Sequence, residues 1–255
     1  MTRPEGEVLA RELEYHDKLY SGFAQTHFAR PAVRALRAHM ARRILESTGA
    51  GIESRVLSLG CGIGDTELLL APQVKEIVGV DLSPAAIRQA AQDAGRLGIR
   101  NARFEQASLD AAPLGEQFDA VIAIFFLHHL PDSELEALPA KLAQMLRPGG
   151  AFYSLDPSRA RLSGVVGRLV IPKLMKKYQT PDERELDGET TAAIFRRQGF
   201  TVRVGMYDFG SSPLAGLFPG WRTGYRMARG VDNALLRVPA LRKRGSNFEL
   251  EGRRA

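Results

Sequence analysis

The sequence predicts an α/β fold in which helices cover both faces of a doubly wound, mostly parallel sheet. Apolar strand patterns and amphipathic helical patterns alternate along the chain with short connections, which is typical of parallel sheets. A strand-like run at 55–59 leads directly into three glycines, and the run from Phe118 to Phe126 is apolar at all but one position. Such a run is expected of a central strand buried on both faces. The 255 residues suffice for one domain of this kind with added segments.

The same patterns place the individual elements. We predict strands at 55–59, 76–81, 101–106, 118–124 and 150–155, with helices near 65–71, 84–97 and 133–146. Ser83 suits the N-cap of the second helix, and Pro84 suits its first turn. The segment 146–150, Leu-Arg-Pro-Gly-Gly, should end the third helix and turn into the fifth strand. Further helices are predicted at 30–45 and 190–198, and further strands at 201–209 and 246–253.

The glycine turn after the first strand predicts a site for a nucleotide-like ligand. Gly60, Gly62 and Gly64 allow a tight turn whose backbone N–H groups can approach a ligand closely. A dinucleotide fingerprint needs glycine three residues after Gly62, where this chain has Asp65, so NAD is not expected. Asp81 ends the second strand and is placed to accept hydrogen bonds from both hydroxyls of a ribose. The alternative is that Asp81 only caps the next helix.

Five segments in the same order resemble the class I S-adenosylmethionine (SAM)-dependent methyltransferases, in particular the small-molecule, methyltransferase type 11 or UbiE-like branch. They are Leu59-Gly-Cys-Gly-Ile-Gly, Val80-Asp-Leu-Ser, Phe118-Asp-Ala-Val, His128-His-Leu-Pro and Leu146-Arg-Pro-Gly-Gly. The resemblance covers 54–209 well and 247–251 weakly. It implies a Rossmann-like sheet of seven strands, the last one antiparallel, with helical lid segments or inserts. It also implies SAM as the cofactor and S-adenosylhomocysteine (SAH) as its product.

The resemblance further implies which residues bind the cofactor. They are Gly60, Cys61, Gly62, Gly64, Asp81, Leu82, Ser108, Leu109, Ala123 and Tyr20. Two positions depart from the family pattern. Ser58 stands where an acidic residue usually reaches the methionine amino group, and Ser108 stands where an aspartate usually accepts the adenine amino group, with Asp110 as its substitute here. A serine hydroxyl can accept a hydrogen bond but brings no charge.

The two histidines after the fourth strand are the candidate catalytic residues. An imidazole titrates near neutral pH, so His129, or else His128, is the predicted base if the nucleophile is a hydroxyl or a protonated amine. The alternative is that this turn only shapes the loop. Tyr153, Asp156 and Tyr178 are weaker candidates. No metal is expected, because adjacent histidines cannot easily face one ion and Asp156 alone does not form a cluster.

The organisation predicted from the sequence is an N-terminal helical cap at 1–45 and a methyltransferase domain at 46–255. Two inserts, 156–198 and 210–245, are predicted to cover the substrate, with ordinary packing as the alternative. Apolar residues in the second insert indicate a partly hydrophobic substrate: Leu214, Leu217, Phe218, Trp221 and Tyr225. Basic residues in the first insert could hold an acidic group, or could be solvated surface charge: Arg159, Arg161, Lys173, Lys176 and Lys177.

The predicted function is methyl transfer from SAM to oxygen or nitrogen of a small molecule, such as a specialised metabolite, a lipid or a sugar-derived intermediate. A net charge of +6, with seven basic residues against one acid at 222–244, leaves two alternatives. These are an RNA or protein methyltransferase and a non-catalytic, SAM-binding or peripheral membrane protein. Nucleic acid is not expected, because the fourth strand ends in Ala123-Ile-Phe-Phe and lacks the Asn/Asp-Pro-Pro-aromatic clamp for a flipped base. The chain has one cysteine and no signal-like or membrane-spanning run, which predicts a cytoplasmic location.

Overall fold

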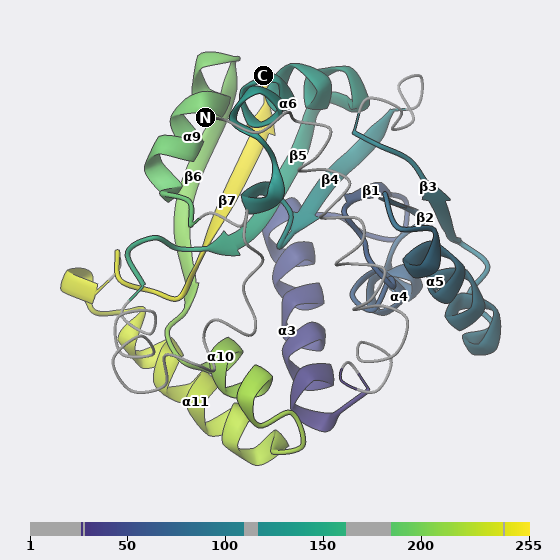
Figure 1. The fold of residues 1–255 in the computed structure, drawn as a ribbon. Helices are drawn as coiled ribbons and strands as arrows, with labels where there is room; N and C mark the ends of the chain where they lie inside the picture. The colour runs from purple at the N-terminus through teal and green to yellow at the C-terminus, as the bar shows by residue number, and fades with distance from the viewer. Residues whose placement is uncertain (1–26, 28, 110–116, 162–184, 242) are drawn as a thin grey trace, which may run out of the picture.

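The fold is built around one sheet of seven strands (Figure 1). The computed structural model of the protein describes residues 27, 29–109, 117–161, 185–241 and 243–255. The strands are β1 (Arg55–Leu59), β2 (Glu76–Asp81), β3 (Ala102–Gln106), β4 (Phe118–Ile124), β5 (Leu146–Pro157), β6 (Phe200–Asp208) and β7 (Asn247–Arg254). Their spatial order is β3-β2-β1-β4-β5-β7-β6. Strands β1 to β5 pair in parallel, and β7 runs antiparallel to both of its neighbours. The predicted sheet is therefore confirmed, including its antiparallel last strand.

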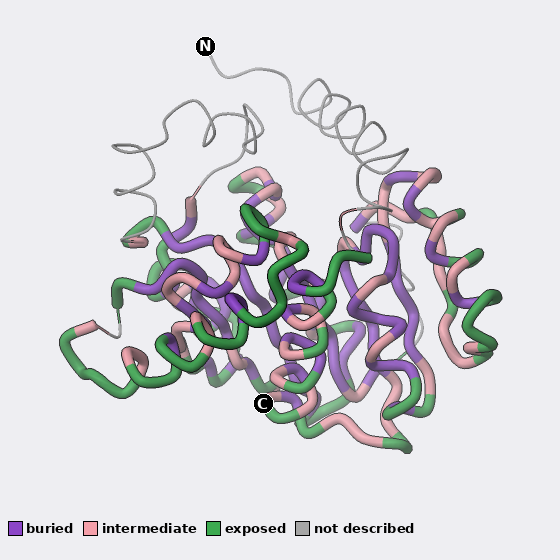
Figure 2. The backbone as a smooth tube through the Cα atoms, turned by 90° about the horizontal axis from the view of Figure 1, so that it is seen from below, coloured by how far each residue is buried: buried purple, intermediate pink, exposed green. Residues whose placement is uncertain are grey.

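Alternating side chains of the central strands enter two separate hydrophobic clusters, one on each face of the sheet. In β4, Ala120 and Ile122 belong to the same cluster as Leu36, Met40 and Ile44, whereas Val121 and Ala123 belong to the opposite cluster. Successive side chains of a strand point to opposite faces of the sheet, so a strand that is apolar at every position must be covered on both faces. Figure 2 shows the buried residues following these strands through the middle of the molecule.

The helices divide between the two faces. Their bounds are α3 (Pro31–Thr48), α4 (Glu67–Leu70), α5 (Pro84–Leu97), α6 (Asp132–Met145), α9 (Gly188–Arg197), α10 (Ser211–Leu217) and α11 (Arg222–Leu235). Short 3₁₀ turns lie at Ala71–Gln73, Leu127–His129 and Pro239–Leu241. Residues of α3, α10 and α11 share one cluster, and residues of α6 and α9 share the other. None of the described helices is long and apolar enough to cross a bilayer. The predicted cytoplasmic location stays a prediction.

Local sequence explains the best predicted helix. Helix α5 begins where Ser83 Oγ accepts a hydrogen bond from Ala86 N at 3.1 Å, with Pro84 in its first turn. It ends at Gly98, which has a φ of 67° that suits glycine. The cap, the proline and the glycine are all readable from the sequence, and the predicted bounds 84–97 are the observed ones.

Several bounds differ from the prediction because tertiary packing extends or shortens an element. Strand β5 begins at Leu146, which pairs with Phe118 ahead of a register shift, so Arg-Pro-Gly-Gly lies within an irregular strand and not in a free turn. Helix α3 continues to Thr48 and is buried along one side, so the predicted boundary at 45 falls inside a core helix. Of the sites named from the sequence, Tyr20, Asp110, Tyr178, Lys173, Lys176 and Lys177 lie outside the described residues.

Candidate active site

The glycine turn lies at the end of β1, where the order of the strands reverses and open α/β sheets bind ligands. Gly60, Gly62 and Gly64 have φ values of 65°, 53° and 71°, which side chains other than glycine rarely adopt. A Cβ on Gly60 would overlap the ring of Phe126, and a Cβ on Gly64 would lie 2.8 Å from the ring of Phe104. The turn therefore needs glycine both for its conformation and for its close packing.

Asp81 connects this turn to the start of α5. Its Oδ2 accepts a hydrogen bond from Gly62 N at 2.8 Å, and its Oδ1 accepts one from Ser83 N at 2.9 Å. Each carboxylate oxygen has a second lone pair, and the side chain is only half-buried. Asp81 thus organises the loops on either side of it, and it keeps acceptor capacity for a ligand. The two predicted roles, a local cap and a ribose acceptor, are compatible.

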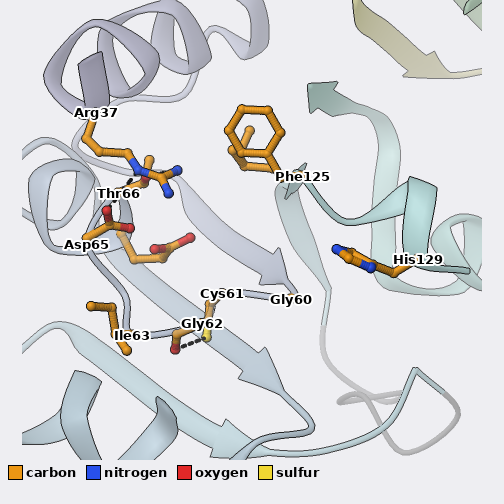
Figure 3. A pocket seen from close by; sticks show the side chains of 11 residues that line it. Arg37, Gly60, Cys61, Gly62, Ile63, Asp65, Thr66, Phe125 and His129 are labelled. Atoms are coloured by element: carbon orange, nitrogen blue, oxygen red, sulfur yellow. Dashed lines mark hydrogen bonds and ion pairs between the residues drawn. The ribbon is translucent and has the colours of Figure 1, made fainter. Parts of the chain in front are cut away.

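A cavity of about 150 Å³ lies between the glycine turn, α3 and the segment that follows β4. Its lining residues are Arg37, Gly60, Cys61, Gly62, Ile63, Asp65, Thr66, Glu67, Ile124, Phe125 and His129. Figure 3 shows Arg37 and Asp65 meeting on one side of this space, with Phe125 and His129 across it. Arg37 Nε lies 2.8 Å from Asp65 Oδ2. Phe125 has a φ of 55°, an uncommon conformation for a bulky residue and one that often marks a functional site.

The 3₁₀ turn at Leu127–His129 places the two histidines in different surroundings. His129 lines the cavity, whereas His128 is 4% exposed and its Nδ1 lies 2.9 Å from Oδ1 of the fully buried Asp156. The same oxygen accepts a hydrogen bond from His128 N at 3.2 Å. With an ionised carboxylate as its partner, Nδ1 is the donor and Nε2 becomes the acceptor. The two rings lie in contact, with centroids 4.0 Å apart.

Sequence reasoning missed Glu67, the first residue of α4. This carboxyl group is 2% exposed, and its Oε1 accepts a hydrogen bond from Ser58 Oγ at 2.6 Å. Burial raises the pKa of Glu67 to about 7, and the hydrogen bond from Ser58 opposes that shift. Ser58, which departs from the family pattern, is 1% exposed at the end of β1. The sequence did offer one signal: β1 has Ser58 at the usual acidic position, and the helix that follows the glycine turn begins with an acid, Glu67.

The remaining predicted residues surround the turn or pack away from it. Cys61 lines the cavity and is buried, which raises the pKa of its thiol well above the usual value. Ala123 is fully buried in β4, where it pairs with Leu59. Leu82, Ser108 and Leu109 follow the ends of β2 and β3, and of these Leu109 is buried.

Tyr153, a weaker catalytic candidate, is placed in the core. Its side chain is fully buried, and its hydroxyl donates a hydrogen bond to Glu249 Oε2 at 2.9 Å. Burial raises the pKa of Tyr153 well above its usual value. These contacts fit a structural role under α3 better than proton transfer.

Comparison with known proteins agrees with this geometry. A family model described as a methyltransferase domain matches residues 56–150. The chain is 31% identical to the uncharacterized methyltransferase YcgJ of Bacillus subtilis over 105 residues, which is 41% of each chain. It is 26% identical to the ubiquinone biosynthesis O-methyltransferase of Pseudomonas fluorescens over 58% of this chain and 65% of that protein. Both matches span less than two thirds of the relative's length.

A solved structure extends the likeness over the whole fold. The N-methyltransferase NodS of Bradyrhizobium japonicum, in complex with SAH, superposes with a TM-score of 0.61 over 95% of this chain and 97% of that one. The sequences are 18% identical, so this likeness concerns the fold.

The residues around the turn fit SAM. This cofactor has two ribose hydroxyls, which need acceptors, and a zwitterionic methionine end, which needs both a cation and an anion. Asp81 offers the acceptors beside the turn, and the cavity presents the guanidinium of Arg37 and the carboxyl of Glu67. Residues 56–150 therefore match a methyltransferase domain, and the sheet that contains them has the fold of the class I SAM-dependent methyltransferases.

Proposed function

We propose that the protein transfers a methyl group from SAM to an oxygen or nitrogen atom of a small molecule. The observation that carries this proposal is the position of His129, which lines the cavity next to the glycine turn. SAM supplies the methyl group on a sulfonium that is its own leaving group. The protein must then position the acceptor atom, exclude water and, for a hydroxyl or a protonated amine, remove a proton.

In this proposal His129 is the base, and His128 with Asp156 positions it. The buried carboxylate of Asp156 fixes the ring of His128 through Nδ1 and through the backbone N–H. The fixed ring packs against the ring of His129 and limits its orientations at the cavity. A neutral amine would react without a base, so the importance of His129 depends on the acceptor atom.

The substrate class rests on two kinds of support. Two of the three similar proteins named above are a ubiquinone biosynthesis O-methyltransferase and the N-methyltransferase NodS, which favour small acceptors at oxygen or nitrogen. The insert at 210–245 contains α10 and α11, which pack against α3 on the same side of the molecule (Figure 1). Tyr225 of α11 and Ala215 of α10 are buried with α3. Leu217, Trp221 and Met227 on the same segment are exposed. A substrate with a hydrophobic portion suits such a surface.

We also propose that the α10–α11 surface rests on an anionic membrane that holds an amphipathic substrate. Most exposed large apolar residues of the described chain lie at 217–238: Leu217, Phe218, Trp221, Met227, Val231 and Val238. Exposed basic residues accompany them: Arg222, Arg226, Arg237, Lys243 and Arg244. Apolar and cationic side chains exposed on one helix are typical of interfacial binding to anionic lipid.

One experiment tests the transfer reaction directly. The purified protein is incubated with SAM and metabolite extracts, and mass spectrometry searches for products that are one methyl group heavier. We expect such a product with the wild type, and a rate roughly 10² to 10⁴ lower with His129→Ala if the acceptor is a hydroxyl. Methylation of RNA or protein in place of small molecules would overturn the substrate class. Binding of SAH with no methylation of any of them would favour a non-catalytic role.

A second experiment tests the membrane surface. Wild-type protein should float with vesicles that contain anionic phosphatidylserine but not with neutral vesicles, and Trp221→Ala combined with Arg226→Ala should reduce flotation. Equal flotation with both vesicle types, or none with either, would contradict an electrostatic membrane contact.

A further inference from the structure

We infer that Glu67, oriented by Ser58, accepts the α-ammonium group at the methionine end of SAM. This inference rests on the proposed function, because it assigns a residue to the cofactor of that reaction. It places the acidic contact on the first turn of α4, although the strand end at β1 offers only the uncharged hydroxyl of Ser58.

The first support is an incompletely satisfied, buried carboxyl group at the cavity. Oε1 of Glu67 accepts the hydrogen bond from Ser58, whereas Oε2 is buried and has no hydrogen-bond partner among the described residues. Glu67 nevertheless lines the cavity. A buried carboxylate without a cation or a further donor is costly, and a ligand that supplies both removes that cost.

The second support is the location of the cavity relative to Asp81. The cavity is bounded by Gly60, Gly62 and α3, but Asp81 is not among its lining residues. A cofactor whose ribose is held at Asp81 would therefore extend past the glycine turn with its amino-acid end in this cavity. That end is a zwitterion, and the cavity contains the Arg37 guanidinium and the Glu67 carboxyl group as opposite charges.

The third support is that the competing acid is already neutralised. Asp65 also lines the cavity, but Arg37 Nε lies 2.8 Å from its Oδ2. The titratable and charged groups that act on Glu67 are Asp65 and Arg37, and Cys61 lies close enough to be affected by Glu67 in turn. Arg37 cannot neutralise two carboxylates fully, so Glu67 is the acid that gains most from an incoming ammonium group.

The binding test compares two ligands and three variants. SAH carries the amino-acid end, whereas 5′-methylthioadenosine contains the same adenosine and sulfur without it. We expect Glu67→Gln to weaken SAH binding by about 10- to 100-fold at about pH 8, as for loss of a charged hydrogen bond, and to leave 5′-methylthioadenosine unaffected. Asp65→Asn is the matched control, and Ser58→Ala should weaken SAH binding less than Glu67→Gln does. Calorimetric titration gives the affinities, and circular dichroism checks that each variant is folded.

A pH series adds a readout that needs no variant. Binding an ammonium group favours ionised Glu67, so wild-type affinity for SAH should fall by up to about tenfold per unit below pH 7. Affinity for 5′-methylthioadenosine should not follow this trend, and Glu67→Gln should abolish it, whereas Asp65→Asn should retain it.

Three results would overturn the assignment. Glu67→Gln could bind SAH as tightly as the wild type does, or it could lose affinity for SAH and 5′-methylthioadenosine equally. The third result is that Asp65→Asn, and not Glu67→Gln, selectively weakens the binding of SAH. Failure of the proposed function would look different, because the wild type would then methylate no small molecule in the transfer assay, whether or not it binds SAH. If SAM is not the cofactor at all, the wild type would bind neither SAH nor 5′-methylthioadenosine.

Discussion

Replacing Glu67 by glutamine should make the protein more stable at and above neutral pH. The pKa of this carboxyl group rises from 4.5 to about 7, chiefly through burial. Between these values the folded protein keeps a proton that the unfolded chain releases, so the free energy of unfolding falls as pH rises through this window. This pKa shift lowers the free energy of unfolding by about 3 kcal/mol once Glu67 is ionised in both the folded and the unfolded protein. Glutamine stays neutral throughout and can still accept the hydrogen bond from Ser58.

The assay is urea unfolding followed by circular dichroism at several values from about pH 5 to pH 8. The stability advantage of Glu67→Gln over the wild type should grow from about 1 kcal/mol at pH 5 to about 3 kcal/mol at pH 8, because the other titrating groups cancel in the difference. Glu136→Gln is the control: its side chain is 56% exposed, so a change within about 0.5 kcal/mol is expected. A difference between Glu67→Gln and wild type that stays constant with pH would refute the reasoning.

Three further predictions concern other buried or shared groups. Arg43→Met should lower the free energy of unfolding by about 3–5 kcal/mol in urea titrations, because it leaves the 4% exposed carboxylate of Glu249 without its cation; an unchanged midpoint would show that the ion pair is dispensable. Burial lowers the pKa of the partly solvated His39 imidazole to about 4, so the unfolded chain takes up a proton before the folded protein does, and the wild type should lose about 1–2 kcal/mol of stability as pH falls from 6.5 towards 4. His39→Gln should remove this loss, and thermal melts of both proteins across that pH range test it. Asp81→Ala should weaken SAH binding by about 1.5–3 kcal/mol in calorimetry, and an unchanged affinity would leave Asp81 with only its structural contact to Gly62.

Most of the sheet was predictable because its signals are local. Strands β1, β2 and β4 have the predicted bounds. Each is a run whose side chains are largely apolar on both faces of the sheet, and each run stops at a glycine, an aspartate or a turn. The early start of β5 was not predictable, because it depends on the pairing of Leu146 with Phe118 from another strand. The alternating pattern of residues 246–253 predicted strand β7, but its antiparallel direction followed only from the family resemblance.

The candidate site was predictable where its residues sit beside a motif. The glycines, Asp81 and the two histidines adjoin strand ends, so their position follows from the strand assignment. Arg37 and Glu67 do not: Arg37 reaches the cavity from a helix whose sequence shows only an amphipathic pattern. An acid in the first helical turn is also ordinary, because it interacts favourably with the helix dipole. Only the fold brings this acid over Ser58.

Helix α3 links the parts of the molecule that the sequence placed in separate regions. Arg43 joins it to Glu249 and Glu251 of β7, while Arg37, less than two turns away, reaches the cavity. At its N-terminal end Ala32 N donates a hydrogen bond to Pro219 O at 2.8 Å, between α10 and α11. The helix that lines the candidate cofactor cavity therefore also supports the proposed membrane and substrate surface. A domain division at residue 45 would separate this helix from the sheet on which it is anchored, so α3 is better regarded as part of the catalytic unit than as a removable cap.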